Sequence, residues 1–415
     1  MIKLFEKFVL MVKDSSLRAR LFFVLGALVL FRILAAIPIP GIDAIRLEQL
    51  FSGSQLLGFL NIFSGGGLSN LSIVMLGVGP YITASIIMQL LTMLSPKMKA
   101  MLHEDGELGR KKFGQYSRLL TIPLALIQGA SFLLLLERQG VIEHLGWFNF
   151  ASNLLVIVAG SLLLMWIGEL ISEFGIGNGV SLIIFSGIVA SIPTYAAQLV
   201  TAFDPSQIPI YIGFLVVSFV IIAGVVAVTE AERPIPITYA KQVRGNRMFG
   251  GVSTYLPLRM NQAGVIPIIF ALSILLFPQM LFNVLSYAQN PMINKIGTWV
   301  SEILLNQWIY GFGYFILVFL FTYFYTAVTF DPESISNNLQ KNGAFIPGVR
   351  PGASTALYIS RILLRITLVG ALFLGIMAIL PLIMQGVTGI QILALGGTSL
   401  LIVVSVVLDL VRKID

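Results

Sequence analysis

The side chains that most often perform chemistry in proteins are scarce in this sequence. It contains no cysteine and only two histidines, His103 and His144, which excludes a thiolate metal site, a cysteine nucleophile and a histidine relay. Residues 106–112 combine glycines with basic residues but lack the spacing of a phosphate-binding loop. Residues 175–179 (GIGNG) have closely spaced glycines, but no strand precedes them, so we interpret them as a tight turn between helices. The sequence therefore predicts no catalytic residue, no metal site and no cofactor.

The composition indicates an integral membrane protein. Of the 415 residues, 57% are hydrophobic and 11% are charged, less than half of the roughly 25% charged residues in soluble domains. Ionisable side chains inside membrane spans usually mark ion or proton pathways. Such residues are nearly absent here, and Arg32 and Glu169 both lie toward the ends of their apolar segments. The pattern argues against a proton-driven pump.

Ten apolar segments are long enough to cross a bilayer as helices, which takes roughly 20 residues each. They are residues 21–38, 72–94, 119–136, 151–172, 180–200, 209–229, 264–285, 308–328, 362–384 and 389–408. With the N-terminus in the cytosol, 22 lysines and arginines fall on cytosolic segments, and three fall on outer segments. Since cytosolic loops carry an excess of basic residues, we predict ten spans with both termini in the cytosol.

Glycine and proline interrupt the sequence at matching places in its two halves. Residues 76–80 (LGVGP) lie in the second predicted span, and residues 261–267 (NQAGVIP) open the seventh. Interruptions at corresponding positions indicate an inverted repeat around a central pathway. We therefore predict two five-span halves, residues 21–200 and 201–408, between a cytosolic segment at 1–20 and a short cytosolic tail at 409–415. The alternative is that glycine and proline are simply frequent in membrane helices.

Residues 55–71 are apolar, but they are too short and too rich in glycine to cross the membrane. Non-helical backbone at membrane depth must be buried in protein or line a water-filled cavity. We therefore expect this stretch to be lodged in a cavity that opens on the outer side. The alternative, an ordinary surface loop, is disfavoured by its many large apolar side chains.

Two long basic loops, residues 230–263 and 329–361, lie on the predicted cytosolic side. Arg350 stands between Val349 and Pro351, and a residue before proline is restricted to extended conformations. We predict a rigid, exposed tip that binds a cytosolic partner through phosphates or carboxylates. Two alternatives stay open: the loop charges contact anionic lipids, or they only set the topology.

Several long motifs occur in a fixed order. They are residues 37–43 (IPIPGID), 61–69 (NIFSGGGLS), 79–91 (GPYITASIIMQLL), 175–179, 263–267 (AGVIP), 343–352 (GAFIPGVRPG) and 396–402 (GGTSLLI). In these motifs the chain resembles the SecY/Sec61-alpha family of protein-export channels over nearly its whole length. The resemblance implies an all-α polytopic membrane protein with ten transmembrane helices. They would form two pseudo-symmetric inverted five-helix halves around a central pore with a plug helix.

The resemblance also assigns site residues. The plug helix, at about 60–71, would include Phe63, Ser64, Gly65, Gly66, Gly67 and Leu68. The pore ring would consist of Val78, Ile82, Ile184, Ile269 and Ile402. Isoleucine and valine are ordinary residues of any span, so composition alone does not distinguish these five.

A lateral gate would lie between spans 2 and 3 on one side and spans 7 and 8 on the other. Its residues would be Ser85, Gln89, Thr92 and Asn261. We predict that Gln89, Thr92 and Asn261 form a hydrogen-bonded patch across the closed gate. The alternative is that each polar group satisfies its own backbone or faces lipid headgroups.

The function implied by the resemblance is a protein-conducting channel in the bacterial plasma membrane. Unfolded preproteins would cross through the pore, and signal sequences or membrane segments would leave sideways. Such a channel is not an enzyme, and its energy would come from a partner ATPase, a ribosome or the proton-motive force. Lys241, Arg244, Arg247 and Arg350 would dock the SecA motor ATPase or a ribosome. The other implied partners are SecE, SecG, preproteins with signal sequences, SecDF, an insertase and anionic lipids, with no direct DNA binding.

Two other function classes make different demands on the sequence. A secondary transporter with inverted repeats would need a substrate site at the membrane midplane, usually with charged residues. An intramembrane enzyme, or an insertase of another fold, would need a catalytic dyad or metal ligands within the spans. The sequence shows neither feature.

Overall fold

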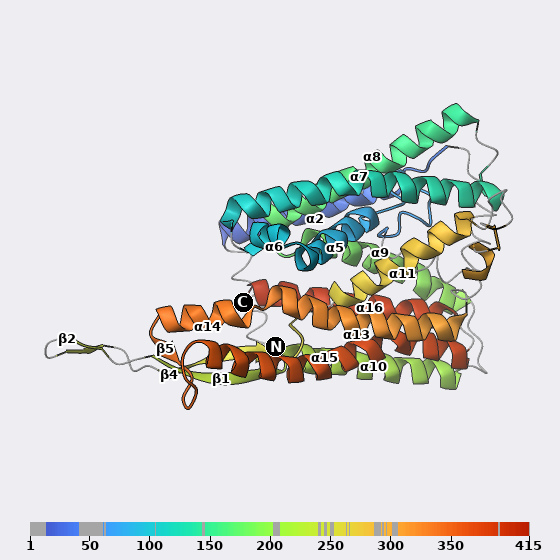
Figure 1. Ribbon diagram of the computed structural model, residues 1–415. Helices are drawn as coiled ribbons and strands as arrows, with labels where there is room; N and C mark the ends of the chain where they lie inside the picture. Colours follow the sequence, from blue (N-terminus) through green and yellow to red (C-terminus); the bar gives the residue numbers. More distant parts are fainter. Residues whose placement is uncertain are drawn as a thin grey trace.

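The chain folds into a bundle of long helices with a narrow sheet projecting from one end (Figure 1). The structure, a computed structural model, describes all residues except 1–13, 41–60, 62–63, 104, 143–145, 202–207, 240–241, 245–246, 250–252, 263, 265, 286–291, 293, 296, 301–305, 389–390 and 415. The long helices are α2 (Ser15–Ala35), α5 (Gly79–Leu94), α7 (Gly106–Arg138), α8 (Trp147–Phe174), α9 (Gly179–Thr201), α10 (Ile208–Glu230), α11 (Ile266–Leu285), α13 (Gln307–Thr329), α15 (Ala353–Thr388) and α16 (Gln391–Ile414). Two shorter helices, α6 (Pro96–His103) and α14 (Pro332–Lys341), extend the bundle.

A helix occupies each of the ten predicted spans. Among the described residues, four segments are long and apolar enough to cross a membrane: Gly106–Arg138, Trp147–Phe174, Trp308–Lys341 and Ala353–Leu380. Shorter apolar helices lie at Gly79–Leu94, Gly179–Thr194, Leu215–Glu230 and Ile266–Leu275. The predicted all-α architecture is therefore confirmed, and the count of ten crossings stays a prediction.

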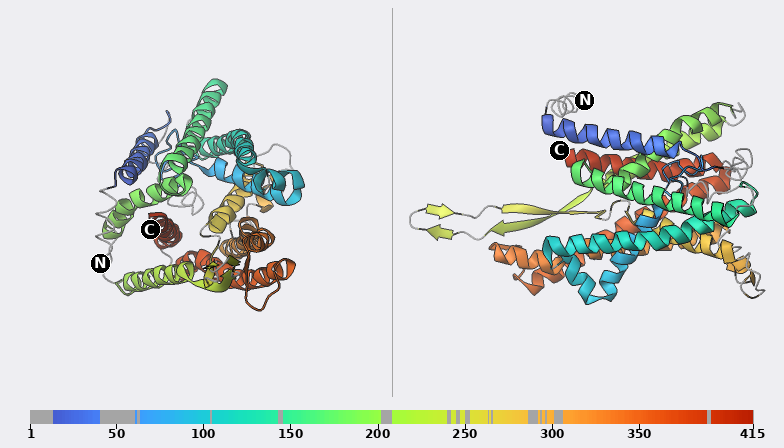
Figure 2. Two further views of the ribbon diagram at one scale, coloured as in Figure 1. Left: turned by 90° about the vertical axis from the view of Figure 1, so that its left-hand side faces the viewer. Right: turned by 90° about the horizontal axis from the view of Figure 1, so that it is seen from above.

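The long helices pack as two groups that are both seen end-on in Figure 2. The first group contains α2, α5, α7, α8 and α9, and the second contains α10, α11, α13, α15 and α16. Helix α11 packs against α5 and α7, while α16 packs against α9. The two groups correspond to the two predicted halves and meet along these two contacts.

The second predicted span begins later than expected, and the predicted plug is helical at Asn61 but not from Ser64 to Leu71. Residues 64–71 and most of 72–78 form consecutive turns, and α5 starts only at Gly79. The reason is local: Gly65, Gly66 and Gly77 have φ values of +65°, +85° and +57°, which interrupt a right-handed helix. Pro80 lies in the first turn of α5, where its missing N–H has no partner to lose. We call residues 64–71 the glycine segment.

The two basic loops join in one small sheet, which hydropathy did not predict. Strands β1 (Glu232–Tyr239) and β4 (Ser253–Arg259) pair antiparallel, and β5 (Ala344–Phe345) from the second loop adds to β1. Strands β2 (Gln242–Arg244) and β3 (Arg247–Phe249) form a separate hairpin at the tip. Because β5 pairs only with Thr238 and Tyr239, the prolines of β1 lie where its second edge is unpaired.

Helix α2 begins, and α16 ends, at the end of the bundle from which β1 and β4 project (Figure 2). We call this the sheet end. Asp14 caps α2 by accepting hydrogen bonds from the backbone N–H and hydroxyl of Ser16, and these bonds lower the pKa of Asp14. Arg412 near the end of α16 donates to Glu230 at 2.7 Å and to the Thr229 carbonyl at 2.6 Å, which ties α16 to the end of α10.

Candidate functional site

The five aliphatic residues assigned to the pore come together in the core of the bundle. Val78 precedes α5, and the others lie on α5, α9, α11 and α16, so both groups of helices contribute. All five belong to one buried hydrophobic cluster, and the most exposed of them, Ile269, is 6% exposed. The same cluster contains many other apolar residues, so burial alone does not give these five a role.

A polar cavity of about 500 Å³ reaches two of these residues, Ile82 and Ile269. Helices α5, α7, α8, α9, α11 and α13 surround it. Its polar lining residues are Tyr81, Ser85, Gln89, Arg118, Glu169, Ser172, Glu173, Asn178, Ser181 and Tyr325. Arg118 donates a hydrogen bond to Glu169 at 2.8 Å in this wall. This cavity, lined largely by polar residues, therefore ends against apolar side chains.

The turn between α8 and α9 positions one wall of the cavity, and it is tight as predicted. The Asn178 side chain accepts from the N–H groups of Val180 and Ser181 at 3.1 and 3.3 Å and so caps α9. A Cβ at Gly179 would overlap the Gly168 carbonyl, so only glycine permits this approach of α9 to α8. Gly177 lies against Leu410 near the end of α16, so this part of the cavity faces the sheet end.

The glycine segment lies beside the far end of α2. Leu71 accepts a hydrogen bond from the Ile39 N–H at 2.9 Å, and Pro38 bridges to Ser72 next to it. Leu68 and Leu71 are buried in a second apolar cluster that includes Phe132 of α7. The predicted plug residues from Ser64 to Leu68 are all buried, and Phe63 lies outside the described residues.

Helix α9 orders these features along one axis. Ser181 lines the polar cavity, Ile184 lies in the aliphatic cluster, and Gly187 contacts Gly65 of the glycine segment. Successive members are three residues apart and so lie near one face of the helix. From Ser181 to Gly187 the helix rises about 9 Å. Polar cavity, apolar core and glycine segment therefore follow one another within a short distance.

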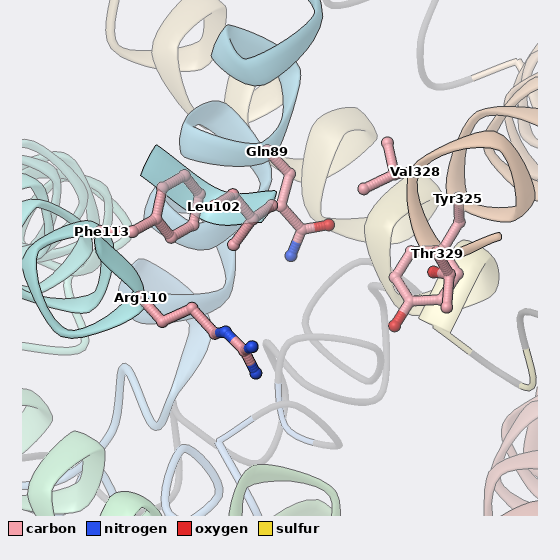
Figure 3. A pocket seen from close by; sticks show the side chains of 7 residues that line it. All are labelled: Gln89, Leu102, Arg110, Phe113, Tyr325, Val328 and Thr329. Carbon is pink, nitrogen blue, oxygen red and sulfur yellow. The ribbon is translucent and has the colours of Figure 1, made fainter. Parts of the chain in front are cut away.

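Two of the predicted gate residues, Ser85 and Gln89, line the polar cavity. Gln89 also borders a second cavity of about 430 Å³, which separates α5, α6 and α7 from α13 (Figure 3). Gln89 and Arg110 point into it from one side, and Tyr325 and Thr329 from the other. The predicted boundary between the halves therefore contains an open space near one end.

Gln89, Thr92 and Asn261 do not form the hydrogen-bonded patch that was predicted across the gate. The Thr92 hydroxyl donates to the Gln89 carbonyl at 2.6 Å, and the Asn261 amide donates to the Gly264 carbonyl at 3.1 Å. The side-chain oxygens of Gln89 and Asn261 are buried without a partner. Each bond stays local because a carbonyl of the same segment is nearer than the opposite helix. Asn261 lies beside Gly370 of α15.

Arg350 is exposed on an anchored turn, as the sequence predicts. Its carbonyl accepts a hydrogen bond from the Thr355 hydroxyl at 2.9 Å. Val349 packs on a small apolar cluster that contains Ile235 and Leu258 of the sheet and Ile346 of the same loop. Of the other predicted docking residues, Arg244 and Arg247 pair in register between β2 and β3, and Lys241 lies outside the described residues.

A family model described as SecY matches residues 72–411. The chain belongs to the SecY family. Three relatives in this family are protein translocase subunits SecY. The one from Synechococcus elongatus is 40% identical over 418 residues, covering 99% of this chain and 94% of the relative. The one from Mycobacterium bovis is 39% identical, covering 98% and 96%, and the one from Thermotoga maritima is 40% identical, covering 97% and 93%.

Solved structures share the SecY fold at low sequence identity. A protein-conducting channel matches with a TM-score of 0.67 and 18% identity, covering 97% of this chain and 93% of that chain. Sec61 in a canine ribosome-channel complex matches with a TM-score of 0.65 and 18% identity over the same shares. These identities establish a common fold and no more.

Two features of the SecY fold were missed by sequence reasoning. The ion pair between Arg118 and Glu169 lines the polar cavity. Of these two residues, the sequence singled out Glu169 as a charge within a span, but not its partner. Arg32 contacts both the glycine segment and α9. Its position as the one charged residue inside the first predicted span was the available signal.

Proposed function

We propose that this chain is the central protein-conducting channel of the Sec translocon in the bacterial plasma membrane. Unfolded preproteins pass through the core of the bundle, and signal sequences or membrane segments leave between the two helix groups. The observation that carries the proposal is the order along α9, in which Ser181 lines a polar cavity, Ile184 joins the aliphatic cluster and Gly187 touches the glycine segment.

In this function the five aliphatic residues form the pore ring. Aliphatic side chains offer no hydrogen bonds to a passing polypeptide, so the chain is not retained. A narrow apolar constriction also loses its water, which hinders ions when no polypeptide is present. The polar cavity on the sheet end keeps an entering chain hydrated until it reaches Ile82 and Ile269.

The glycine segment serves as the plug. The segment lies beside the end of α2 opposite the sheet end, and Gly65 touches α9 one helical turn beyond Ile184. It therefore stands on the far side of the pore ring from the polar cavity. There it adds a second barrier to ions and small solutes.

The lateral gate lies where α11 packs against α5 and α7. The cavity in Figure 3 leaves α13 separated from α5 and α7 at one end, so the contact to be broken is short. Polar contacts between helices in membranes average only about 0.6 kcal/mol. The unpartnered oxygen of Gln89 adds no bond that an apolar signal helix must displace.

The sheet end faces the cytosol and docks the partners that supply energy. It carries the basic loops, and Arg350 is exposed on the anchored turn. Because the backbone of this turn is already ordered, binding of a partner requires little further ordering of it. SecA and the ribosome bind here, while SecE and SecG complete the channel in the membrane. Both termini lie on this side, with residues 21–200 and 201–408 as the two halves.

An export assay tests this function. Inverted membrane vesicles carrying the protein receive SecA, ATP and a preprotein stalled midway by a folded domain. A photoreactive residue at Ile82 or Ile184 is expected to crosslink to the stalled chain. The matched control is Ile192 on the same helix as Ile184, which is 52% exposed on the outside of the bundle. Equal crosslinking from Ile192, or none from Ile82 and Ile184, would contradict the proposal.

A further inference from the structure

Arg32 joins two segments that are far apart in the sequence. One Nη atom donates a hydrogen bond to the Gly65 carbonyl at 3.1 Å. The other donates to the carbonyls of Ser186 and Gly187 on α9, at 2.8 and 3.2 Å. The planar guanidinium holds its donors in a fixed fork, so it can serve acceptors on both sides at once.

The backbone around Arg32 is packed too closely for side chains. A Cβ at Gly187 would overlap the Cα of Gly65, and a Cβ at Gly65 would overlap the ring of Phe31. A Cβ at Gly66 would lie 3.3 Å from the Arg32 Nη1 atom. Gly65 and Gly66 also have positive φ values of +65° and +85°, which other residues rarely adopt. The glycine segment therefore fits this site in one arrangement only.

A charge at the position of Arg32 is energetically unfavourable. It lies near the end of α2, partly buried, and its guanidinium stands 5.5 Å from the centroid of the buried Phe31 ring. Charged side chains within membrane spans are rare, and those that occur usually have polar partners and a specific role. Here the guanidinium donates hydrogen bonds to backbone carbonyls of the glycine segment and α9.

We propose that Arg32 is the positioning residue that holds the glycine segment against α9 and releases it when the pore widens. The inference rests on the proposed channel function. Ile184 of the pore ring lies three residues before Gly187, so both lie near one face of α9. When a polypeptide pushes Ile184 outward, the carbonyls of Ser186 and Gly187 move with it and leave the fork of Arg32. Widening of the pore and release of the segment are therefore one event.

The first test measures accessibility of the segment. Ser64 is 1% exposed, and Ser64→Cys supplies a nearly isosteric thiol in a chain without cysteine. In the purified protein, Arg32→Met is expected to raise the maleimide labelling rate of this thiol by about tenfold or more, since hydrogen bonds from a charged donor are lost. Arg32→Lys, which keeps the charge without the fork, is expected to give an intermediate rate.

The control thiol is Ser336→Cys on α14, a site that is 2% exposed and far from Arg32 in the sequence. Labelling at position 336 should not change in Arg32→Met. A parallel rise at both positions would indicate general unfolding and would overturn the positioning role. If Arg32→Met does not accumulate, Arg32→Lys carries the test, because it keeps the charge and removes the fork that reaches both segments.

The second test measures function. Vesicles with Arg32→Met are expected to leak ions without a partner, and to export preproteins with defective signal sequences, about tenfold more than wild type. If the wild-type protein exports normally and Arg32→Met changes neither the ion leak nor the labelling rate, the role of Arg32 is overturned and the channel function stands. If the wild-type protein itself exports no preprotein, the channel function is overturned. The labelling result would still decide whether Arg32 holds the glycine segment.

Discussion

Arg118 on α7 and Glu169 on α8 form an ion pair in the wall of the polar cavity, with 2.8 Å between Nε and Oε1. The Glu169 side chain is 19% exposed and that of Arg118 is 51% exposed. Both helices belong to the first helix group, so the pair braces one side of the cavity and does not cross the proposed gate. Opening of the proposed gate would therefore leave this ion pair intact.

This arrangement predicts a small coupling in stability between Arg118 and Glu169. A double-mutant cycle with Arg118→Gln and Glu169→Gln should give about 0.5–1 kcal/mol, since one partner is well exposed to water. The measurement is thermal or denaturant unfolding of the protein in detergent. The control is the exposed pair of Glu107 and Lys111, whose coupling should be smaller because water screens both charges. A larger coupling at the control pair would contradict the prediction.

Polar substitution in the pore ring should loosen the closed state. Ile269→Ser or Ile402→Ser places a hydroxyl in the apolar cluster, which favours water in the constriction. We expect higher ion conductance and export of preproteins with defective signal sequences. Ile376→Ser on α15 is the control, because Ile376 is 51% exposed on the outside of the bundle. Unchanged conductance in both ring variants would remove the ring from the seal.

Locking α5 to α11 should stop export. Ser85 and Ile266 line the same cavity from these two helices, and cysteines at both positions can be joined by a bismaleimide. A short spacer is expected to block translocation, while a long spacer restores it because the helices can separate. Single-cysteine variants treated alike serve as controls. Full export with the short crosslink in place would show that this boundary does not open.

Charge reversal at the anchored turn should uncouple the motor. Arg350→Glu is expected to abolish SecA-driven export while the protein still inserts, because the turn is held by its own contacts and not by the Arg350 side chain. Arg361→Glu provides a matched control on the same loop side, since Arg361 is also exposed. Export and membrane insertion are measured in the same vesicles. Similar defects in both variants would point to net charge instead of a docking residue.

The sequence alone determined the membrane class, the positions of the long helices and the presence of anchored basic loops. Spans are readable because each must be apolar over its whole length, whatever it packs against. The turn at residues 175–179 was equally readable, because its glycines stand between two apolar segments with no strand before them. The family motifs then supplied the five residues proposed for the pore ring, which composition could not single out.

Only the tertiary structure decided what the polar and glycine residues do. Hydropathy predicted a second span from residue 72, but the positive φ values at Gly65, Gly66 and Gly77 delay the helix to Gly79. The expected gate bonds of Thr92 and Asn261 turned out to be local. Such contacts depend on which backbones come within about 3 Å after packing. That is why the link from Arg32 to both Gly65 and α9, across more than 150 residues for the second, could not be read from spacing.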